Sequence, residues 1–416
     1  MKERFICSLL WEHLSIHPHG HSSPCCEVEW SSPLAFAKNK IDGEFTQRVL
    51  NVENGIENVI NSDAYKQIRL EMLNGQIPSA CTTCYKVEQN GGISKRLREK
   101  APDVDYRLIT AEDGSIKPSI KNLELRLGNY CNLKCRSCNA ESSTSWIDDY
   151  HKLKHKVNLP SAYDDIVKSD TTSYDWVDSY EFYEEIFDNA PNLELLQVSG
   201  GEPFLVDKHS HLLQLLIDSG RAEHMTVSYI TNANYKFDRI KPILDKLTKF
   251  KNVTISISLD DVYKRNDYIR SLSNFQLTIN NIKRYIDEYN FTYSITQTVN
   301  AFNFFYIEEL SQFLVAEGLF NFDRTGPIQF INDNYVFSPD YQSANIFPRE
   351  LRQQKIDSIK GLIPDYFYMR LKGHFYNPEP NGKLGEFITT TAAVDEVRRE
   401  KFELIFPEIA NIIKTL

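Results

Sequence analysis

The sequence contains no cysteine after Cys138, although most of its 416 residues follow that position. It also has no basic excess, because its formal net charge is -10, which disfavours a phosphate backbone or an anionic membrane as the main partner. No apolar run is long enough for a signal peptide or a membrane span, since Glu12 and His13 interrupt the first candidate. We therefore expect a cytoplasmic protein without membrane contact, and nucleic acid is not an expected partner.

The overall composition is that of a folded protein. Hydrophobic residues make up 41% and charged residues 25%, and the chain contains 22 Tyr and 24 Phe, which argues against disorder. A length of 416 residues exceeds the usual limit for one hydrophobic core. The expected organisation is one large domain with a smaller one.

The cysteines lie in two groups near the start of the chain. The first group comprises Cys7, Cys25, Cys26, Cys81 and Cys84, and the second comprises Cys131, Cys135 and Cys138. In a reducing compartment, such clustering indicates metal binding more than disulfides. We predict a cysteine-rich module over residues 1–100 and a linker over residues 101–120.

From residue 121 onward, strands and helices alternate. The predicted strands are 122–128, 193–200, 225–232, 253–260, 291–300 and 325–332. Repeated alternation predicts parallel strands with helices outside them. An insertion at 141–190 is interpreted as a lid or substrate-contacting segment, or alternatively as a solvated excursion. The domain is predicted to span 121–335, and terminal helices are expected in 336–416.

Two predicted strands carry one hydroxyl-rich face. The first strand places Thr254, Ser256, Ser258 and Asp260 opposite Ile255, Ile257 and Leu259, and the second places Thr292, Ser294, Thr296, Thr298 and Asn300 together. A parallel strand buried on both sides would be apolar on both faces. This pattern favours a sheet curled around a polar lumen. Alternatively, Thr and Ser occur in these strands only because such short residues are compatible with strand structure.

The stretch "GNYCNLKCRSCNA" places Cys131, Cys135 and Cys138 directly after the first predicted strand. Ligands bind at this edge of parallel sheets and barrels. A structural zinc site would require a fourth ligand. A [4Fe-4S] cluster held by three thiolates would leave one iron open to chemistry.

With "SGGEP" at 199–203 and "SISLDD" at 256–261, this motif resembles the radical S-adenosylmethionine (SAM) superfamily in order and spacing. The resemblance covers roughly residues 120–335. It implies an α/β fold, an incomplete TIM-like (β/α)6 barrel with the small amino-terminal module and terminal helices added. One departure is Ser137, where many members carry a bulkier residue.

The resemblance implies that Cys131, Cys135 and Cys138 bind a [4Fe-4S] cluster whose fourth iron is chelated by SAM. One-electron reduction, from a donor such as flavodoxin or ferredoxin, would then yield a 5'-deoxyadenosyl radical. These three cysteines are the predicted catalytic residues.

The other motifs are expected to bind SAM. The residues implied are Gly200, Gly201, Glu202, Pro203, Ser258, Asp260 and Arg270. Backbone carbonyls of the glycine motif would accept bonds from the SAM ammonium, and Pro203 would hold the turn. Ser258 and Asp260 would face the ribose, and Arg270 would bind the carboxylate. By themselves, "GGEP" would be an ordinary turn and Arg270 a solvated helix residue.

The amino-terminal cysteines predict a second site. A hairpin between Cys7 and Cys25, with C-x2-C at Cys81 and Cys84, would bring these four thiolates together. Zinc also suits this set. The layout resembles twitch and SPASM auxiliary-cluster modules, which favours iron and sulfur, although those modules usually follow the barrel. Cys25 is preferred to Cys26 because neighbouring strand residues point to opposite sides.

The histidines of the same hairpin are His13, His17, His19 and His21, and we interpret them as surface residues unless the cluster has a mixed ligand shell. The expected activity is hydrogen abstraction from a peptide or protein. The alternatives are the same chemistry on a small metabolite or nucleotide, and a zinc-stabilised interaction module without catalysis.

Overall fold

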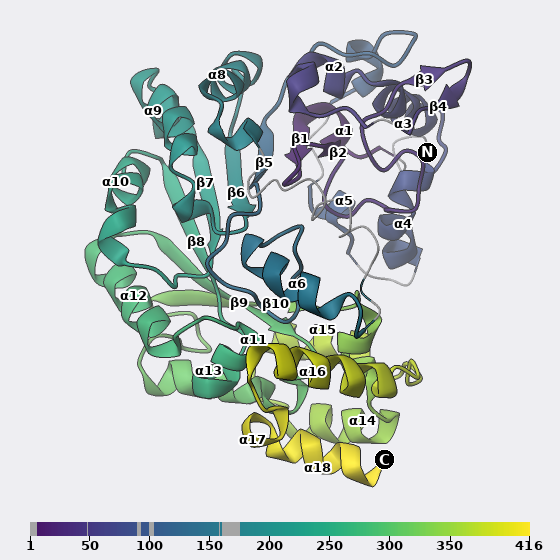
Figure 1. Cartoon of the computed structure of the whole chain (residues 1–416). Coiled ribbons are helices and arrows are strands. Elements are labelled where there is room, and N and C mark those ends of the chain that lie inside the picture. The colour runs from purple at the N-terminus through teal and green to yellow at the C-terminus, as the bar shows by residue number, and fades with distance from the viewer. Residues whose placement is uncertain (1–5, 48, 90–92, 100–103, 158, 160–174) are drawn as a thin grey trace. The chain divides into compact units, whose positions relative to one another are not determined.

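A computed structural model describes residues 6–47, 49–89, 93–99, 104–157, 159 and 175–416 (Figure 1). The chain divides into two compact units. The first comprises Met1–Gly128, Ser173–Ser228 and Ile243–Asn252, and the second comprises Asn129–Thr172, Tyr229–Pro242 and Val253–Leu416. The boundary passes through strand β7, Thr226–Thr231. The amino-terminal cysteines therefore belong to the first unit and the cysteine loop after β5 to the second.

In the first unit, the strand order is β7–β6–β5–β1–β2. β5 (Asn122–Leu127) and β6 (Leu195–Gly200) run parallel. β1 (His13–Ile16) pairs antiparallel with β2 (Ser22–Ser23), which confirms the predicted hairpin. β1 also pairs in parallel with β5, with Ser15 opposite Glu124. The amino-terminal segment thus extends the sheet, a pairing that the sequence did not indicate.

Helices of the first unit bury one apolar face each. In α9, Leu212, Leu213 and Leu216 are buried, and the chain leaves the helix at Gly220 with a φ of 75°. The remaining elements are α1 (Leu9–Glu12), α2 (Ile56–Ile60), α3 (Asp63–Leu73), α4 (Thr82–Gln89), α5 (Lys95–Arg98), α8 (Tyr180–Asn189), α9 (Ser210–Asp218), β3 (Lys40–Ile41) and β4 (Glu44–Phe45).

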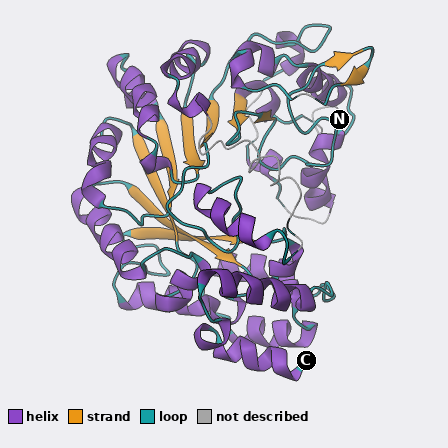
Figure 2. Cartoon of the chain, in the orientation of Figure 1, coloured by secondary structure: helices purple, strands orange, loops and turns teal. Residues whose placement is uncertain are grey.

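In the second unit, strands and helices alternate along the chain (Figure 2). Its strands lie in the sheet in the order β10–β9–β8–β7. The strands are β8 (Asn252–Ser258), β9 (Thr292–Val299) and β10 (Ile328–Tyr335), and the helices beside them are α10 (Phe237–Leu247), α11 (Tyr263–Ile269), α12 (Phe275–Glu288) and α13 (Ile307–Ala316). β9 runs parallel to both β8 and β10. Among the described strands, β10 pairs only with β9, as expected at the open edge of an incomplete barrel. Each predicted strand forms, and the α/β class is confirmed.

The hydroxyl-rich faces of β8 and β9 bond to each other. The hydroxyl oxygens of Ser256 and Thr296 lie 2.8 Å apart, and Ser294 Oγ donates to Ser256 Oγ at 3.0 Å. Ile255 and Ile257 on the opposite face are fully buried. Polar residues are tolerated here because their hydroxyls are satisfied by neighbouring strands.

The carboxy-terminal region is helical, as predicted. Its helices are α14 (Arg349–Ser358), α15 (Asp365–Phe375), α16 (Leu384–Arg398), α17 (Phe402–Ile405) and α18 (Pro407–Thr415). Aromatic rings pack this region onto the rest of the second unit. The ring centroids of Phe302 and Phe387 lie 5.0 Å apart, and those of Tyr268 and Phe406 lie 5.3 Å apart. Among the described residues, no helix combines the length and apolar character that crossing a bilayer requires.

The predicted insertion 141–190 contains α6 (Ile147–Leu153) and the helix α8. Residues 158 and 160–174 of this predicted segment lie outside the described residues.

Candidate metal centres

The cysteine loop places three thiols within one short segment. The N–H of Cys138 donates to the carbonyl of Cys135 at 3.0 Å, which forms a turn between these two residues. The N–H of Leu133 and the Nδ2 of Asn232 point at the Cys131 sulfur, at 3.4 and 3.8 Å. None of the three cysteines is in a disulfide. Donors directed at a cysteine sulfur stabilise a thiolate, as an iron ligand requires.

Side chains from the segment before α6 hold the carbonyls of this loop. Ser145 Oγ donates to the Cys131 carbonyl at 2.7 Å, Ser143 Oγ to that of Leu133 at 2.6 Å, and Trp146 Nε1 to that of Cys135 at 2.8 Å. These bonds orient each part of the loop from the same side. The sequence reasoning missed Ser143, Ser145 and Trp146 because they belong to no recognisable motif.

Arg270 lies beside the cysteine loop. Its Nη1 donates to Asp260 Oδ2 at 3.0 Å. Loss of contact with water lowers the pKa of Arg270, but the charges of Cys135 and Asp260 outweigh this effect and hold the pKa above its ordinary value. The guanidinium is therefore positioned close to the cysteine sulfurs. This arrangement suits recognition of an anionic group at the cluster.

Asp260 is fully buried, and each of its carboxylate oxygens has a partner. Arg270 donates to Oδ2, and the N–H of Thr298 donates to Oδ1 at 2.9 Å. The structure thus brings together Asp260 and Arg270, which the sequence had assigned separately to ribose and carboxylate. Ser258 ends β8 opposite Thr296 of β9. The ligand roles of these three residues stay predictions.

The glycine motif belongs to the first unit. Gly200 has a φ of 130°, and a Cβ there would lie 2.6 Å from the backbone nitrogen of Leu127. The N–H of Gly201 donates to the Gly128 carbonyl at 3.1 Å. Close packing against β5 therefore requires glycine at position 200, whether or not a ligand approaches.

The residues that follow form a tight turn. Glu202 is fully buried and accepts the N–H of Phe204 through Oε1 at 3.2 Å, and Pro203 opens the 3-10 helix Pro203–Leu205. This confirms a turn at "GGEP", and its contact with SAM stays a prediction.

The amino-terminal thiols of Cys7, Cys25, Cys81 and Cys84 line one cavity in the first unit. Its other lining residues are the apolar Leu9, Leu10, Pro24, Val28, Met72 and Ala80 and the charged Glu27, Lys95 and Arg96. Burial raises the pKa of the Cys81 thiol, and the three other thiols raise it further. Neighbouring thiolates repel each other unless a cationic group neutralises them, so this donor set fits an iron–sulfur cluster.

Cys26 is not among the residues that line this cavity. Its sulfur accepts a hydrogen bond from Lys95 Nζ at 3.1 Å. The adjacent residues Cys25 and Cys26 thus face different surroundings, in agreement with the preference for Cys25, whose role as a ligand stays a prediction.

The prediction that the hairpin histidines are surface residues is wrong for His13 and His17, whereas His19 and His21 are partly exposed. His17 is 5% exposed and its Nε2 lies 2.8 Å from Ser23 Oγ, while the side chain of His13 is 2% exposed. Burial lowers the pKa of His13 to about 4 and that of His17 to about 3. The pairing of β1 with β5 covers this hairpin, and local alternation of histidines could not reveal it.

Two family models match the chain. Residues 7–85 match an iron–sulfur cluster-binding domain, SPASM, and residues 125–279 match a 4Fe-4S single cluster domain. An uncharacterised protein of Methanocaldococcus jannaschii is 25% identical over 233 residues, which are 54% of this chain and 69% of that protein.

Solved structures show weaker similarity. The structure titled native anSMEcpe with bound AdoMet is 17% identical, with a TM-score of 0.34, over 57% of this chain and 62% of that one. Streptococcus suis SuiB bound to S-adenosylmethionine is 15% identical, with a TM-score of 0.35, over 74% of this chain and 63% of that one. The chain thus spans about three fifths of the length of these two proteins.

Both matched models describe iron–sulfur cluster binding, and together they cover both cysteine groups of the chain, in agreement with the resemblance that the motifs predict. The matches support a [4Fe-4S] cluster and an auxiliary iron–sulfur cluster as the cofactors. The match to an iron–sulfur domain over residues 7–85 favours iron and sulfur over zinc in the amino-terminal module.

Proposed function

We propose that Cys131, Cys135 and Cys138 hold the SAM-binding cluster, and that the enzyme removes a hydrogen atom from a peptide or protein. When bound and reduced, the cluster and SAM supply a 5'-deoxyadenosyl radical. The observation that carries this proposal is the set of three cysteines, none in a disulfide, in one short loop after β5 whose backbone bonds to the residues on both sides of Arg270. Three thiolates leave one iron of a [4Fe-4S] cluster for SAM.

The residues around the loop have defined tasks in this proposal. Arg270 neutralises the SAM carboxylate, and Asp260 orients Arg270 through its 3.0 Å bond. Asn232 and the N–H of Leu133 stabilise the Cys131 thiolate. The carbonyls of "GGEP" accept the SAM ammonium, with Ser258 on the ribose side. A flavodoxin or ferredoxin supplies the electron, in the cytoplasm.

The amino-terminal module supports the choice of a peptide or protein substrate. Residues 7–85 match the SPASM domain, and such modules commonly accompany modification of ribosomally made peptides. Cys7, Cys25, Cys81 and Cys84 are the proposed ligands of its cluster.

The cluster assignment is tested by replacing Cys131, Cys135 and Cys138 together with Ala. Anaerobically reconstituted variant protein, mixed with SAM and dithionite, should produce no 5'-deoxyadenosine and should keep only the iron of the auxiliary cluster. Wild-type production of 5'-deoxyadenosine by this variant would refute the proposal.

The substrate class is tested with a cell extract of the source organism. Substrate should stimulate 5'-deoxyadenosine formation by wild-type enzyme, and prior digestion of the extract with a non-specific protease should abolish the stimulation. The protease is inactivated before the enzyme is added. Stimulation that survives digestion and passes a filter for small molecules would instead establish a metabolite or nucleotide substrate.

A further inference from the structure

The cysteine loop is tied to the segment after α11 through its backbone. The N–H of Lys134 donates to the Ser271 carbonyl at 3.0 Å, and the N–H of Arg136 donates to the Ile269 carbonyl at 2.7 Å. Cys135 lies between the two donors, and Arg270 lies between the two acceptors. Movement of either segment would therefore move the other.

The side chain of Arg136 connects the loop to the end of α16. It is 3% exposed and forms ion pairs of 2.5 Å with both Asp395 and Glu400. Its guanidinium carbon lies 3.6 Å from the ring centroid of Tyr268, and the Tyr268 hydroxyl donates to Asp395 at 2.7 Å. A buried arginine in the middle of the cysteine motif is thus held by carboxylates more than 250 residues away in sequence.

Arg398 makes the second connection. Its Nε donates to Asp149 Oδ2 at 2.7 Å, and Lys134 Nζ donates to Asp149 Oδ1 at 2.8 Å. The side chains of Arg398 and Asp149 are 1% and 2% exposed. Arg398 Nη1 also donates to Ser271 Oγ at 2.8 Å, so this arginine contacts both segments that flank the cysteine loop.

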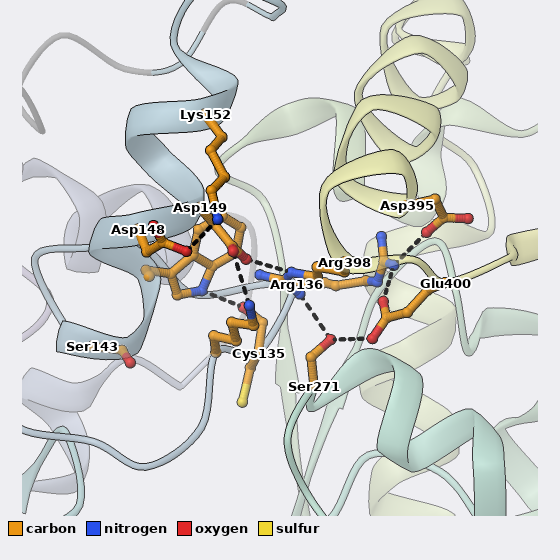
Figure 3. A network of polar contacts seen from close by, with 12 residues as sticks. Cys135, Arg136, Ser143, Asp148, Asp149, Lys152, Ser271, Asp395, Arg398 and Glu400 are labelled. Atoms are coloured by element: carbon orange, nitrogen blue, oxygen red, sulfur yellow. Dashed lines mark hydrogen bonds and ion pairs between the residues drawn. The ribbon is translucent and has the colours of Figure 1, made fainter.

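Together these residues form what we call the charged clamp: Lys134, Arg136, Asp149, Asp395, Arg398 and Glu400 (Figure 3). It has three cations and three anions: Lys134 and Arg398 pair with Asp149, and Arg136 pairs with Asp395 and Glu400. Figure 3 shows the Arg136 and Arg398 side chains between the cysteine loop and α16.

Stability alone does not account for the clamp. Replacing buried ion pairs by apolar side chains is often neutral or stabilising. The same two helices, α6 and α16, already pack through an apolar cluster that includes Trp146, Tyr150 and Val394. Charged groups beside an iron–sulfur cluster, in contrast, change the free energy of adding an electron.

We propose that the charged clamp positions Cys135 and sets the reduction potential of the SAM-binding cluster. The inference rests on the proposed assignment of Cys131, Cys135 and Cys138 as cluster ligands. Reduction adds one negative charge to the cluster, so nearby cations favour the reduced state and nearby anions the oxidised state. Because the clamp is balanced as a whole, removal of one charge leaves an uncompensated opposite charge close to the cluster.

The test compares the variants Arg398→Gln and Asp395→Asn in the full, anaerobically reconstituted protein. The midpoint potential is measured from the electron paramagnetic resonance signal of the reduced cluster. The SAM-binding cluster is recognised because its signal changes when SAM is added. The potential should fall in Arg398→Gln and rise in Asp395→Asn. Iron from this cluster should also pass to a chelator at least about tenfold faster in Arg398→Gln, because groups that orient metal ligands commonly contribute about 10- to 100-fold to metal retention.

The matched control is Glu396→Gln on the same helix. Glu396 pairs with Lys156 at 2.7 Å, but their side chains are 69% and 40% exposed, so solvent should screen the change and leave the potential unaltered. Arg398→Lys, which retains the charge, should restore the potential while iron release stays faster than in wild type.

Shifts of the same sign in both variants, or potentials equal to that of Glu396→Gln, would overturn the inference. If Arg398→Gln does not fold, Asp395→Asn and Glu400→Gln carry the test, because both remove an anion and both should raise the potential. The variant in which Cys131, Cys135 and Cys138 are replaced with Ala distinguishes failure of this inference from failure of the proposed function. If its iron content and 5'-deoxyadenosine production equal those of wild type, the assignment of these cysteines as cluster ligands is wrong.

Discussion

The two cysteine sites of this chain are built in different ways. In the first unit, Cys7, Cys25, Cys81 and Cys84 come from separate segments and line a mostly apolar cavity. In the second unit, Cys131, Cys135 and Cys138 come from one short loop whose carbonyls and backbone amides are held by polar groups. One site depends on distant segments folding together, whereas the other depends on a local turn that is held in place from outside.

This difference corresponds to the chemistry expected of each site. Four thiolates in an apolar cavity complete the ligation of a cluster and exclude further ligands, as in structural metal sites. Three thiolates leave a coordination position open, and Arg270, whose side chain is 12% exposed, provides a charge for the group that fills it. The surroundings of the two sites therefore differ as much as their ligand counts.

The largest expected effect is loss of one cluster by removal of its ligands. Replacing Cys7, Cys25, Cys81 and Cys84 with Ala should lower iron from about eight to about four atoms per chain, and the remaining cluster should still respond to SAM. Iron analysis and the paramagnetic signal of the reduced protein check this. Loss of the SAM-responsive signal in this variant would contradict the independence of the two sites.

A smaller effect is expected at the pair formed by Asp260 and Arg270. Asp260→Asn should weaken SAM binding by roughly tenfold to a hundredfold, since a charge-assisted bond contributes about 1.5 to 3 kcal/mol. If Asp260 acts by orienting Arg270, the double variant with Arg270→Gln should bind SAM no more weakly than Arg270→Gln alone. Additive losses in calorimetric titrations would instead support a direct contact of Asp260 with the ribose.

Acid should affect the amino-terminal hairpin before the cysteine loop. Burial lowers the pKa of His13 and His19 to about 4, below the ordinary value of 6.5, so between these pH values only the unfolded hairpin binds protons. The two neutral histidines therefore contribute fully to the free energy of unfolding above pH 6.5. Their contribution declines as the pH falls toward 4, by up to about 1.4 kcal/mol per histidine for each unit of difference between its folded and unfolded pKa.

Hydrogen exchange corrected for its intrinsic pH dependence measures this decline. Residues 13–23 should lose protection between pH 7 and 5 while residues 134–153 keep theirs, and His13→Gln should flatten the dependence of the hairpin. Equal loss of protection in both segments would show that the buried histidines are not its cause.

The smallest expected effect is that of Cys26→Ala. Because Cys26 bonds to Lys95 and does not line the cavity, iron content should stay at the wild-type value, whereas Cys25→Ala should lower the iron of the auxiliary cluster. The two variants exchange neighbouring residues of the same type, so each serves as the control of the other. A loss of iron in Cys26→Ala with retention in Cys25→Ala would reverse the assignment.

The sequence by itself determined the features that depend on short spacing. Alternation of apolar and polar residues located the strands, for example 291–300 for β9 at Thr292–Val299, because side chains of a strand repeat every two residues. The C-x3-C-x2-C spacing located the cysteine loop, since Cys131, Cys135 and Cys138 lie close together in the sequence. The expected hairpin between Cys7 and Cys25 also formed where Pro18 and Gly20 interrupt the strand.

Only the tertiary structure decided which distant side chains meet. The parallel pairing of β1 with β5 buried histidines that local alternation had placed at the surface. Asp260 paired with Arg270, and Arg136 met Asp395 from 259 residues away. Such contacts depend on how helices and strands pack, and a charged side chain in a sequence does not reveal whether its partner will be water or a buried ion of opposite charge.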